Sequence, residues 1–396
     1  MNVFLALVAA SLLSRLSYQM ARSPVLPRFA EDLGAGPELI GMIVAASTVT
    51  GIFLKLPAGA LSDVLGKKRM MVLGSLFFAG PPFLYPFVHS AEALLALRFV
   101  HGFATGIFSP VASAYVASLG TKNRGARLGW YGSVNDIGST AGPLVGGLVL
   151  FYTASFEATY LLVGALGVLA LILVLRLPES RAGPSPEDSQ ESQSRQFVKG
   201  LAEVLSTTPL IVASCVEGAM YFGFGAFLGF LPTYGKTVGL NDAEVAVILG
   251  IQLATAMAMK PIAGRTSDLI GRKAVIVAGL LFCALSLPFI FRASDLTTLM
   301  VLSAFLGFGV AAVTPVTHAL VADVAKERHL GAAMGVFGTI FDVGEAAGPI
   351  AAGFLIGQMS YASAFDLLAA VVVAGAIAFI VLVRDPTAPR GAQAST

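Results

Sequence analysis

The sequence predicts an all-α membrane protein with twelve transmembrane helices in two six-helix bundles. Hydrophobic residues make up 56% of the 396 residues and charged residues only 12%, with a mean hydropathy of +0.82. Apolar segments of about 20 residues, the length that crosses a bilayer, recur along the chain. The second half also repeats the first in register. This composition excludes a soluble enzyme, and 25 cations against 23 acids give no bias toward nucleic acid.

Twelve apolar segments define the predicted spans. Residues 179–205 separate the sixth span from the seventh and are rich in Ser, Glu, Gln and Pro, which predicts a cytoplasmic linker. The predicted organisation is therefore an N-terminal bundle (1–178), the linker, a C-terminal bundle (206–384) and a cytoplasmic tail (385–396). The predicted spans are 2–29, 37–62, 69–88, 91–118, 126–153, 156–177, 206–234, 241–264, 274–292, 295–322, 330–357 and 361–383.

The first span is predicted to be retained, because its first cation, Arg15, lies inside the apolar run and not ahead of it. Cys215 and Cys283 both lie in apolar segments, which is typical of small buried side chains. The four histidines show no spacing of metal ligands. We therefore expect no metal, no cofactor and no disulfide framework.

The distribution of lysine and arginine predicts the orientation. If the ends and every second loop lie on one side, that side holds 17 of the 25 cations and the opposite side holds three. Such a bias in short loops places the cation-rich side in the cytoplasm. We expect both termini to be cytoplasmic, in a multi-pass protein of the cell inner membrane.

The chain is an internal duplication. At an offset of 205 residues, nine of twenty positions are identical between 55–74 and 260–279. After one inserted residue the offset becomes 206, and 138–147 aligns with 344–353. Each half has six spans, an even number, so both halves enter the membrane in the same direction. A pseudo-twofold axis along the membrane normal then relates them, and a site near the midplane between the bundles is expected.

The loop after the second span of each half contains a repeated motif, Gly59-Ala-Leu-Ser-Asp63-Val-Leu-Gly66-Lys67-Lys68-Arg69 and Gly264-Arg265-Thr-Ser-Asp268-Leu-Ile-Gly271-Arg272-Lys273. This motif resembles the cytoplasmic loop signature of the major facilitator superfamily, and the resemblance covers essentially the whole chain. Val64 and Leu269 stand where that family usually has a cation, so neighbouring cations replace it. The resemblance implies that this loop helps to close the cytoplasmic side. A plain polar turn is the alternative. The predicted gate residues are Gly59, Asp63, Gly66, Lys67, Lys68, Gly264, Asp268, Gly271, Arg272 and Lys273.

Two further segments extend the resemblance. Arg98 in the fourth span matches the arginine that this family links to proton coupling, although backbone carbonyls could also satisfy it. His101 is interpreted as a satisfied polar neighbour. The fifth span resembles the glycine–proline motif of exporters that work by exchange, with helix packing alone as the alternative. Its predicted packing residues are Gly138, Gly142, Pro143, Gly146 and Gly147.

Four carboxylates lie inside predicted spans, and buried acids in membrane proteins indicate function. Asp342 and Glu345 are three residues apart, so one of them could hold a proton. Asp136 is the repeat mate of Asp342, and a coupling role and a structural hydrogen bond are weighed equally. The predicted proton-coupling set is Asp136, Asp342, Glu345 and Arg98. Glu217 in the seventh span could pair with Arg15 of the first.

The first span is unusually polar for a membrane helix, with polar side chains at three- and four-residue steps. A lipid-facing Arg15 would be costly, so this stripe is predicted to line a cavity and to meet an anionic or zwitterionic group of the substrate. Internal ion pairs are the alternative. The predicted cavity residues are Arg15, Tyr18, Gln19, Arg22, Arg98, Glu217 and Tyr221.

The resemblance and the buried charges together predict a secondary transporter and not an enzyme. We expect a monomeric proton-coupled antiporter that exports a small amphipathic molecule by alternating access, with protons, the substrate and the lipid bilayer as its partners. The alternatives are an importer or uniporter of an anionic or zwitterionic metabolite and a membrane sensor that does not transport.

Overall fold

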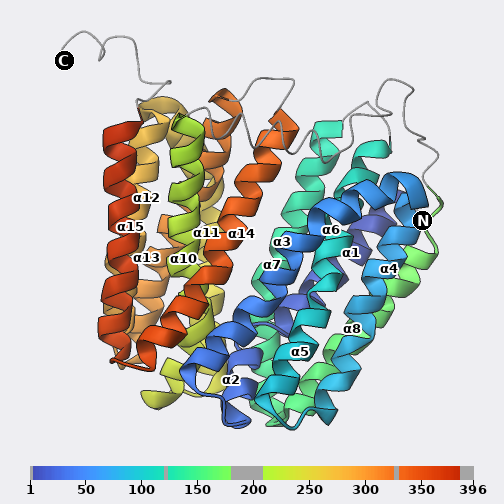
Figure 1. The fold of residues 1–396 in the computed structure, drawn as a ribbon, viewed down its shortest axis with the longest axis horizontal. Coiled ribbons are helices and arrows are strands. Elements are labelled where there is room, and N and C mark those ends of the chain that lie inside the picture. Colours follow the sequence, from blue (N-terminus) through green and yellow to red (C-terminus); the bar gives the residue numbers. More distant parts are fainter. Residues whose placement is uncertain (1–2, 120–123, 180–207, 325–329, 384–396) are drawn as a thin grey trace. The chain divides into compact units, whose positions relative to one another are not determined.

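The computed structural model describes residues 3–119, 124–179, 208–324 and 330–383, and this part of the chain contains helices and no strands (Figure 1). The helices of the first half are α1 (Val3–Met20), α2 (Val25–Asp32), α3 (Pro37–Leu65), α4 (Lys67–Ala79), the 3-10 helix η1 (Pro81–Phe87), α5 (Ala91–His101), α6 (Phe103–Ser118), α7 (Arg124–Thr153) and α8 (Phe156–Leu175). Those of the second half are α10 (Thr208–Thr237), α11 (Asp242–Ile270), α12 (Arg272–Ile290), α13 (Leu296–Val324), α14 (Leu330–Ile356) and α15 (Tyr361–Leu382).

The helices coincide with the predicted spans. In the described part of the chain, 11 helical segments are long and apolar enough to cross a membrane. The remaining predicted span is α7, a helix of 30 residues that contains polar residues such as Asn135, Asp136 and Ser139. Those residues lower its hydropathy, while its length of about 45 Å exceeds the bilayer core. The all-helical prediction is confirmed.

Three spans of the first half are interrupted, which the sequence pattern did not predict. A turn at 21–24 separates α1 from α2, and the pair Pro81-Pro82 ends the regular helix after α4, since proline removes a backbone donor. A single turn residue, Gly102, separates α5 from α6. The corresponding α10, α12 and α13 of the second half are continuous. The repeated sequence therefore does not produce identical helices.

The backbone contacts divide the chain into two compact units. One contains Met1–Ser194 with Asn241–Ala246, and the other contains Arg195–Leu240 with Val247–Thr396. The predicted linker from residue 180 onward and the predicted tail lie outside the described residues.

The same helix pairs pack in both units. In the first unit α1 packs on α7 and α8, while α4 packs on α6 and α8. In the second unit α10 packs on α14 and α15, while α12 packs on α13 and α15. These are the pairs that the 205-residue repeat relates, so the duplication seen in the sequence is also a duplication of packing.

A close helix crossing recurs at the same register position. A Cβ on Gly102 would lie 2.8 Å from Cα and O of Ser47 in α3, and a Cβ on Gly307 would collide with the carbonyl of Gln252 in α11. Ser47 and Gln252 are themselves 205 residues apart. Only a residue without a side chain allows this approach. The crossing is thus fixed by one glycine in each unit.

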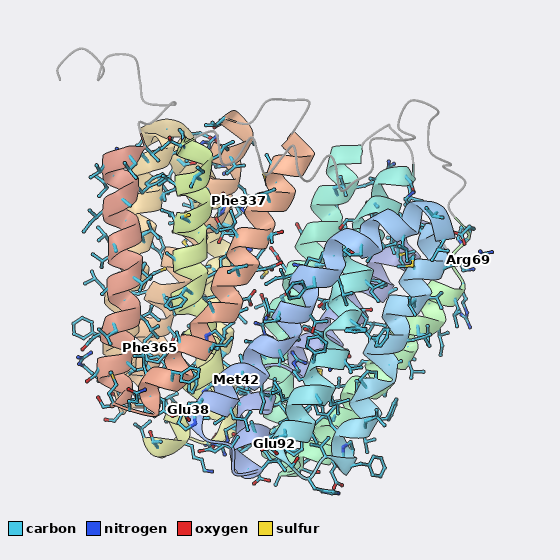
Figure 2. The ribbon with its side chains drawn as sticks, in the orientation of Figure 1. Glu38, Met42, Arg69, Glu92, Phe337 and Phe365 are labelled. Carbon is cyan, nitrogen blue, oxygen red and sulfur yellow. The ribbon has the colours of Figure 1, made fainter. Side chains whose placement is uncertain are left out.

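The two ends of the first unit differ in charge. Glu38 and Glu92 lie in the first turns of α3 and α5 at one end, while Arg69 of α4 lies at the opposite end (Figure 2). Acids in a first helical turn interact favourably with the helix dipole. The end that contains Glu38 and Glu92 is the one that the cation count predicts to be extracytoplasmic.

Candidate functional site

A polar cavity lies inside the first unit. Its volume is about 210 Å³, and α1, α6 and α7 supply most of its wall. Hydroxyl groups dominate the lining, and the charged side chain among the lining residues is Arg15. The lining residues are Ser11, Ser14, Arg15, Phe78, Thr105, Phe108, Ser109, Ser113, Tyr131 and Asn135.

Arg15 is held by a short chain of hydrogen bonds to α7. Its Nε donates to Ser139 Oγ at 2.8 Å, and that hydroxyl donates to the Asn135 carbonyl at 2.9 Å. The side chain of Asn135 in turn donates to the Tyr131 carbonyl at 2.9 Å. Because the bond uses Nε, the two terminal nitrogens of Arg15 stay available. Within the described residues they make no hydrogen bond or ion pair.

Two hydroxyls of α1 extend the polar wall. Ser11 Oγ donates to Tyr131 Oη at 3.3 Å. Ser14 is only 1% exposed, and its Oγ finds no hydrogen-bond partner in the described part of the chain. A buried hydroxyl without a partner is costly. The wall beside Arg15 therefore contains unused hydrogen-bonding capacity.

Arg98 lies in a separate aromatic cluster of the first unit. Its guanidinium is completely buried and lies 4.8 Å from the centre of the Tyr18 ring, a cation–π contact. Arg98 Nη1 lies 3.4 Å from His101 Nδ1, and the Tyr85 hydroxyl lies 3.0 Å from the same nitrogen. If both groups donate to Nδ1, His101 is neutral and protonated on Nε2.

No carboxylate of the described residues forms an ion pair with Arg98. Its Nε and Nη2 have no hydrogen-bond partner there, and the ionisable groups that act on it are the hydroxyls of Tyr18, Tyr85 and Tyr160. A buried cation surrounded by neutral groups is energetically expensive. Tyr18, predicted to line the substrate cavity, packs against Arg98 and His101 in this cluster.

The second unit buries a carboxyl where α10 meets α13. Glu217 of α10 is completely buried, and Thr317 of α13 donates its Oγ1 hydrogen to Glu217 Oε2. Oε1 has no hydrogen-bond partner among the described residues, although His318 Nδ1 lies 3.7 Å away. Lys260 of α11 is within electrostatic range of both Glu217 and His318. Sequence reasoning identified Glu217 but none of these partners.

The Thr317 hydroxyl can serve the carboxyl in either protonation state. It also lies 3.0 Å from the carbonyl of Val313. With Glu217 ionised, Thr317 donates to the carboxylate. With Glu217 protonated, the carboxyl donates to Thr317 Oγ1, and the hydroxyl hydrogen turns to Val313. The buried group is hydrogen-bonded both with and without its proton.

His318 lies beside this carboxyl at a partly exposed position. Its Nδ1 is 2.7 Å from the Thr314 carbonyl, which can only accept, so Nδ1 has the hydrogen. The other ring nitrogen is then free to gain a proton. The side chain is 38% exposed, whereas Glu217 is fully buried. Phe337 of α14 packs edge-on against the ring, with the ring centres 4.8 Å apart.

Comparison with known proteins decides the family. A sequence model described as Major Facilitator Superfamily matches residues 7–251 and 214–396. The chain belongs to the Major Facilitator Superfamily. It is 24% identical over 376 residues to an uncharacterized superfamily transporter of Methanocaldococcus jannaschii, covering 91% of this chain and 94% of that relative. It is also 24% identical over 335 residues to the quinolone resistance protein NorA of Staphylococcus aureus, with 84% of each chain covered.

Solved structures of the superfamily have the same fold. The nucleoside transporter NupG superimposes with a TM-score of 0.82 at 15% identity, covering 97% of this chain and all of that one. The human organic anion transporter MFSD10 gives 0.69 at 19% identity, with 95% and 98% covered. This chain is thus a multi-pass membrane transporter of the Major Facilitator Superfamily and not an enzyme.

The superfamily loop is built alike in both units. Gly66 and Gly271 have φ values of +96° and +99°, which favour glycine, and each separates two helices. Ser62 and Ser267 donate to the carbonyls of Gly59 and Gly264, both at 2.7 Å. These glycines therefore shape the same tight turn twice.

The charged residues of the two loops make different contacts. Arg272 pairs with Asp268 at 2.7 Å and with Asp323 at 3.2 Å. Lys273 Nζ donates to two carbonyls at the end of α15, each at 2.7 Å.

In the first unit the Lys68 amide donates to Glu179 at 3.1 Å, and Lys67 is half-buried. The side chain of Asp63 lies outside the described residues. A gate that joins the two halves stays a prediction.

The glycines of the exporter-like motif face the first helix. A Cβ on Gly138 would lie 3.1 Å from Arg15 Cβ, and one on Gly142 would collide with Gln19. A Cβ on Gly146 would lie 2.7 Å from the Met20 carbonyl. Gly147 faces Pro24 and Ala246, and the ring of Pro143 is buried. This stripe brings α7 against α1, behind the Arg15 side chain.

The other predicted residues are dispersed. Arg22 lies in the turn after α1, where its Nη2 donates to Thr48 at 3.5 Å. Tyr221 packs on Phe341 at 4.9 Å between α10 and α14. Asp136 is half-buried on α7. On α14, Asp342 is buried and Glu345 is half-buried. None of these side chains is among the lining residues of the polar cavity.

The repeat could have indicated His318, but not Thr317, whose mate is Ala112. Ser109 and Ser113, which line the polar cavity, correspond at the 205-residue offset to Thr314 and His318. The polar face of the fourth span is therefore present in the tenth, with an ionisable residue at its end. Extending the 205-residue alignment along the tenth span is enough to show this correspondence.

A larger cavity of about 450 Å³ lies at the other end of the first unit. Its wall comes from α2, η1 and the start of α8, and it includes none of the predicted site residues. Its floor is formed by Tyr85 and Tyr160, stacked 3.9 Å apart and both completely buried.

Proposed function

We propose that this transporter is a proton-coupled antiporter that exports a small amphipathic molecule, with Glu217 as the proton-binding group. The supporting observation is the Glu217–Thr317 pair, which is hydrogen-bonded in both protonation states. A carboxyl buried inside a membrane protein takes up a proton readily, because burial disfavours its charged form. His318 supplies a partly exposed neighbour through which the proton can arrive.

This proposal changes the assignment made from the sequence. The sequence predicts Asp136, Asp342, Glu345 and Arg98 as the proton-coupling set and Glu217 as a residue of the substrate cavity. Glu217 is now preferred, because a hydroxyl partner and an ionisable neighbour surround it.

Export is supported by the relative named for quinolone resistance, since a transporter can give resistance by removing a drug from the cell. With the predicted cytoplasmic termini, protons would enter as substrate leaves.

The test is transport in proteoliposomes with an imposed pH gradient, for which quinolones are the first substrates to try. Glu217→Gln should abolish accumulation driven by the gradient, because an amide cannot release a proton. Exchange of labelled for unlabelled substrate without a gradient should continue. Thr317→Val should lower gradient-driven transport about tenfold, as expected for loss of a hydrogen bond to a charged group.

Thr339→Val is the matched control. Thr339 of α14 also bonds the carbonyl four residues earlier, at 3.0 Å, but it is only half-buried and forms no hydrogen bond with an acid among the described residues. Its transport should equal that of the wild type. Full gradient-driven transport by Glu217→Gln would refute proton coupling through this residue, and the Asp342→Asn and Glu345→Gln variants would then be examined.

A further inference from the structure

The polar cavity of the first unit indicates the chemistry of the substrate. We propose that it is a binding site for an oxyanion, in the first instance a carboxylate, and that Arg15 and Ser14 bind this group. The inference rests on the proposed function for its role in transport, but the binding itself does not depend on proton coupling. It names the part of the amphipathic substrate that the first unit recognises.

The orientation of Arg15 is the first argument. A guanidinium that is held through Nε presents Nη1 and Nη2 together, and these two donors match the two oxygens of a carboxylate. Ser139 holds Nε at 2.8 Å and is itself fixed to the Asn135 carbonyl. The arginine is therefore oriented before any ligand arrives, which lowers the entropic cost of binding.

The unpaired hydroxyl of Ser14 is the second argument. It is buried, lines the same cavity and has no partner among the described residues. A ligand oxygen that accepts from Ser14 would remove the cost of leaving this hydroxyl unbonded. Ser14 and Arg15 are adjacent on α1, so one oxyanion could use both.

The absence of acid from this wall is the third argument. No Asp or Glu is among the lining residues of the cavity, and Arg15 makes no ion pair within the described residues. Internal charge balance therefore does not account for the cation. Arg22 is a poorer candidate, because it lies in the turn after α1 and outside this cavity.

The size of the cavity limits the ligand. About 210 Å³ is below the range of a complete drug-sized pocket, and so it fits one acidic group with an attached ring. Phe78 and Phe108 supply apolar wall for that ring, while Thr105, Ser109 and Ser113 supply further hydroxyls. An aromatic carboxylate is the simplest molecule of this description.

The experiment measures equilibrium binding of radiolabelled benzoate to the purified full-length protein in detergent, with neutral benzamide as competitor and unlabelled benzoate as reference. Benzoate should bind saturably, and benzamide should compete at least tenfold more weakly. Arg15→Gln and Ser14→Ala should each raise the Kd for benzoate, the first by tenfold or more. The Kd of Arg15→Lys for benzoate should lie between those of the wild type and Arg15→Gln, because lysine keeps the positive charge but lacks the two paired terminal nitrogens of arginine.

Arg22→Gln is the matched control and should bind benzoate as the wild type does. Ser14→Ala removes one oxygen atom, so it tests the site even if Arg15→Gln does not fold. Equal competition by benzamide, no saturable binding, or a loss confined to Arg22→Gln would overturn the proposal. Glu217→Gln should keep its affinity for benzoate, so failure of proton coupling and failure of this site are distinguishable.

Discussion

The first unit completely buries the Arg98 guanidinium, whereas the second completely buries the Glu217 carboxyl. The first meets aromatic rings and a histidine, and the second meets a threonine hydroxyl and a histidine. Around them the two units pack the same helix pairs and repeat the same glycine crossing. The contrast teaches that the duplication preserved the backbone packing, while each unit buries an ionisable group whose repeat mate is uncharged, Ser303 for Arg98 and Leu12 for Glu217.

The largest expected effect tests the shared packing. Gly344→Ala should destabilise the protein by about 3 kcal/mol, because a Cβ there collides with the Gly218 carbonyl of α10. Its mate Gly138→Ala should cost less, since the nearest atom is a side-chain Cβ at 3.1 Å, on Arg15. Thermal unfolding in detergent measures both.

Glycines without neighbours on the same two helices are the controls. A Cβ on Gly335 of α14 or Gly129 of α7 meets nothing within 4 Å. Alanine there should be neutral or stabilising by up to about 1 kcal/mol, since it favours a helix. If Gly335→Ala destabilised the protein as much as Gly344→Ala, close packing would not be the cause of the destabilisation at Gly344.

A smaller effect tests the buried charge of the first unit. Arg98→Met should change the free energy of unfolding by less than about 1 kcal/mol, because it removes a desolvated cation that has no acidic partner. Arg98→Lys should be less stable than Arg98→Met, since an ammonium is more strongly hydrated. The comparison is made by thermal unfolding.

The outcome has a clear alternative. If Arg98→Met lowered the free energy of unfolding by several kcal/mol, the guanidinium would have a strong partner in the folded protein. The two units would then both compensate their buried charge, and the contrast between them would be weaker.

The smallest effect concerns two helix caps that are repeat mates. Ser90 caps α5 by accepting from the Ala93 amide at 3.2 Å, and Asp295 caps α13 by accepting from the Thr298 amide at 2.8 Å. That hydrogen bond lowers the pKa of Asp295. Its stabilisation is present above the unfolded pKa of about 3.9 and is lost as the pH falls through the lower folded value.

The difference in unfolding temperature between the wild type and Asp295→Ser should therefore shrink between about pH 5 and pH 3. The corresponding difference for Ser90→Ala should not depend on pH in this range, because a hydroxyl does not titrate there. A pH-independent difference for Asp295→Ser would show that its charge contributes nothing to the cap.

Hydropathy predicted the helices well because a bilayer imposes a length and an apolar composition on each span. It did not predict the breaks at 21–24, 81–82 and 102 in the first unit. These depend on local chemistry: a proline pair can end a helix, and Gly102 has a counterpart, Gly307, inside a continuous helix. Glycine at the same register position interrupts the helix in the first unit and lies inside a continuous helix in the second. Contacts with neighbouring helices therefore decide whether the helix is interrupted.

The candidate sites were only partly predictable. Arg15 and Glu217 were identified because charges within apolar segments are rare. Their partners were not, since Ser139 is 124 positions from Arg15 and Thr317 is 100 from Glu217. Such pairs depend on which faces of the helices meet. The repeat register, applied residue by residue to the tenth span, points to His318 beside Glu217 but not to Thr317, which aligns with Ala112.

The glycine stripe of α7 has a consequence for ligand recognition. Gly138, Gly142 and Gly146 bring the backbone of α7 against α1, so the helix that contains Arg15 and the helix that contains Ser139 and Asn135 form one rigid wall. At the proposed oxyanion site, such a wall would present the same donors to the anion throughout a transport cycle. The rate of release would then depend on how strongly water hydrates the anion that leaves. A weakly hydrated anion would leave the site more slowly than a strongly hydrated one.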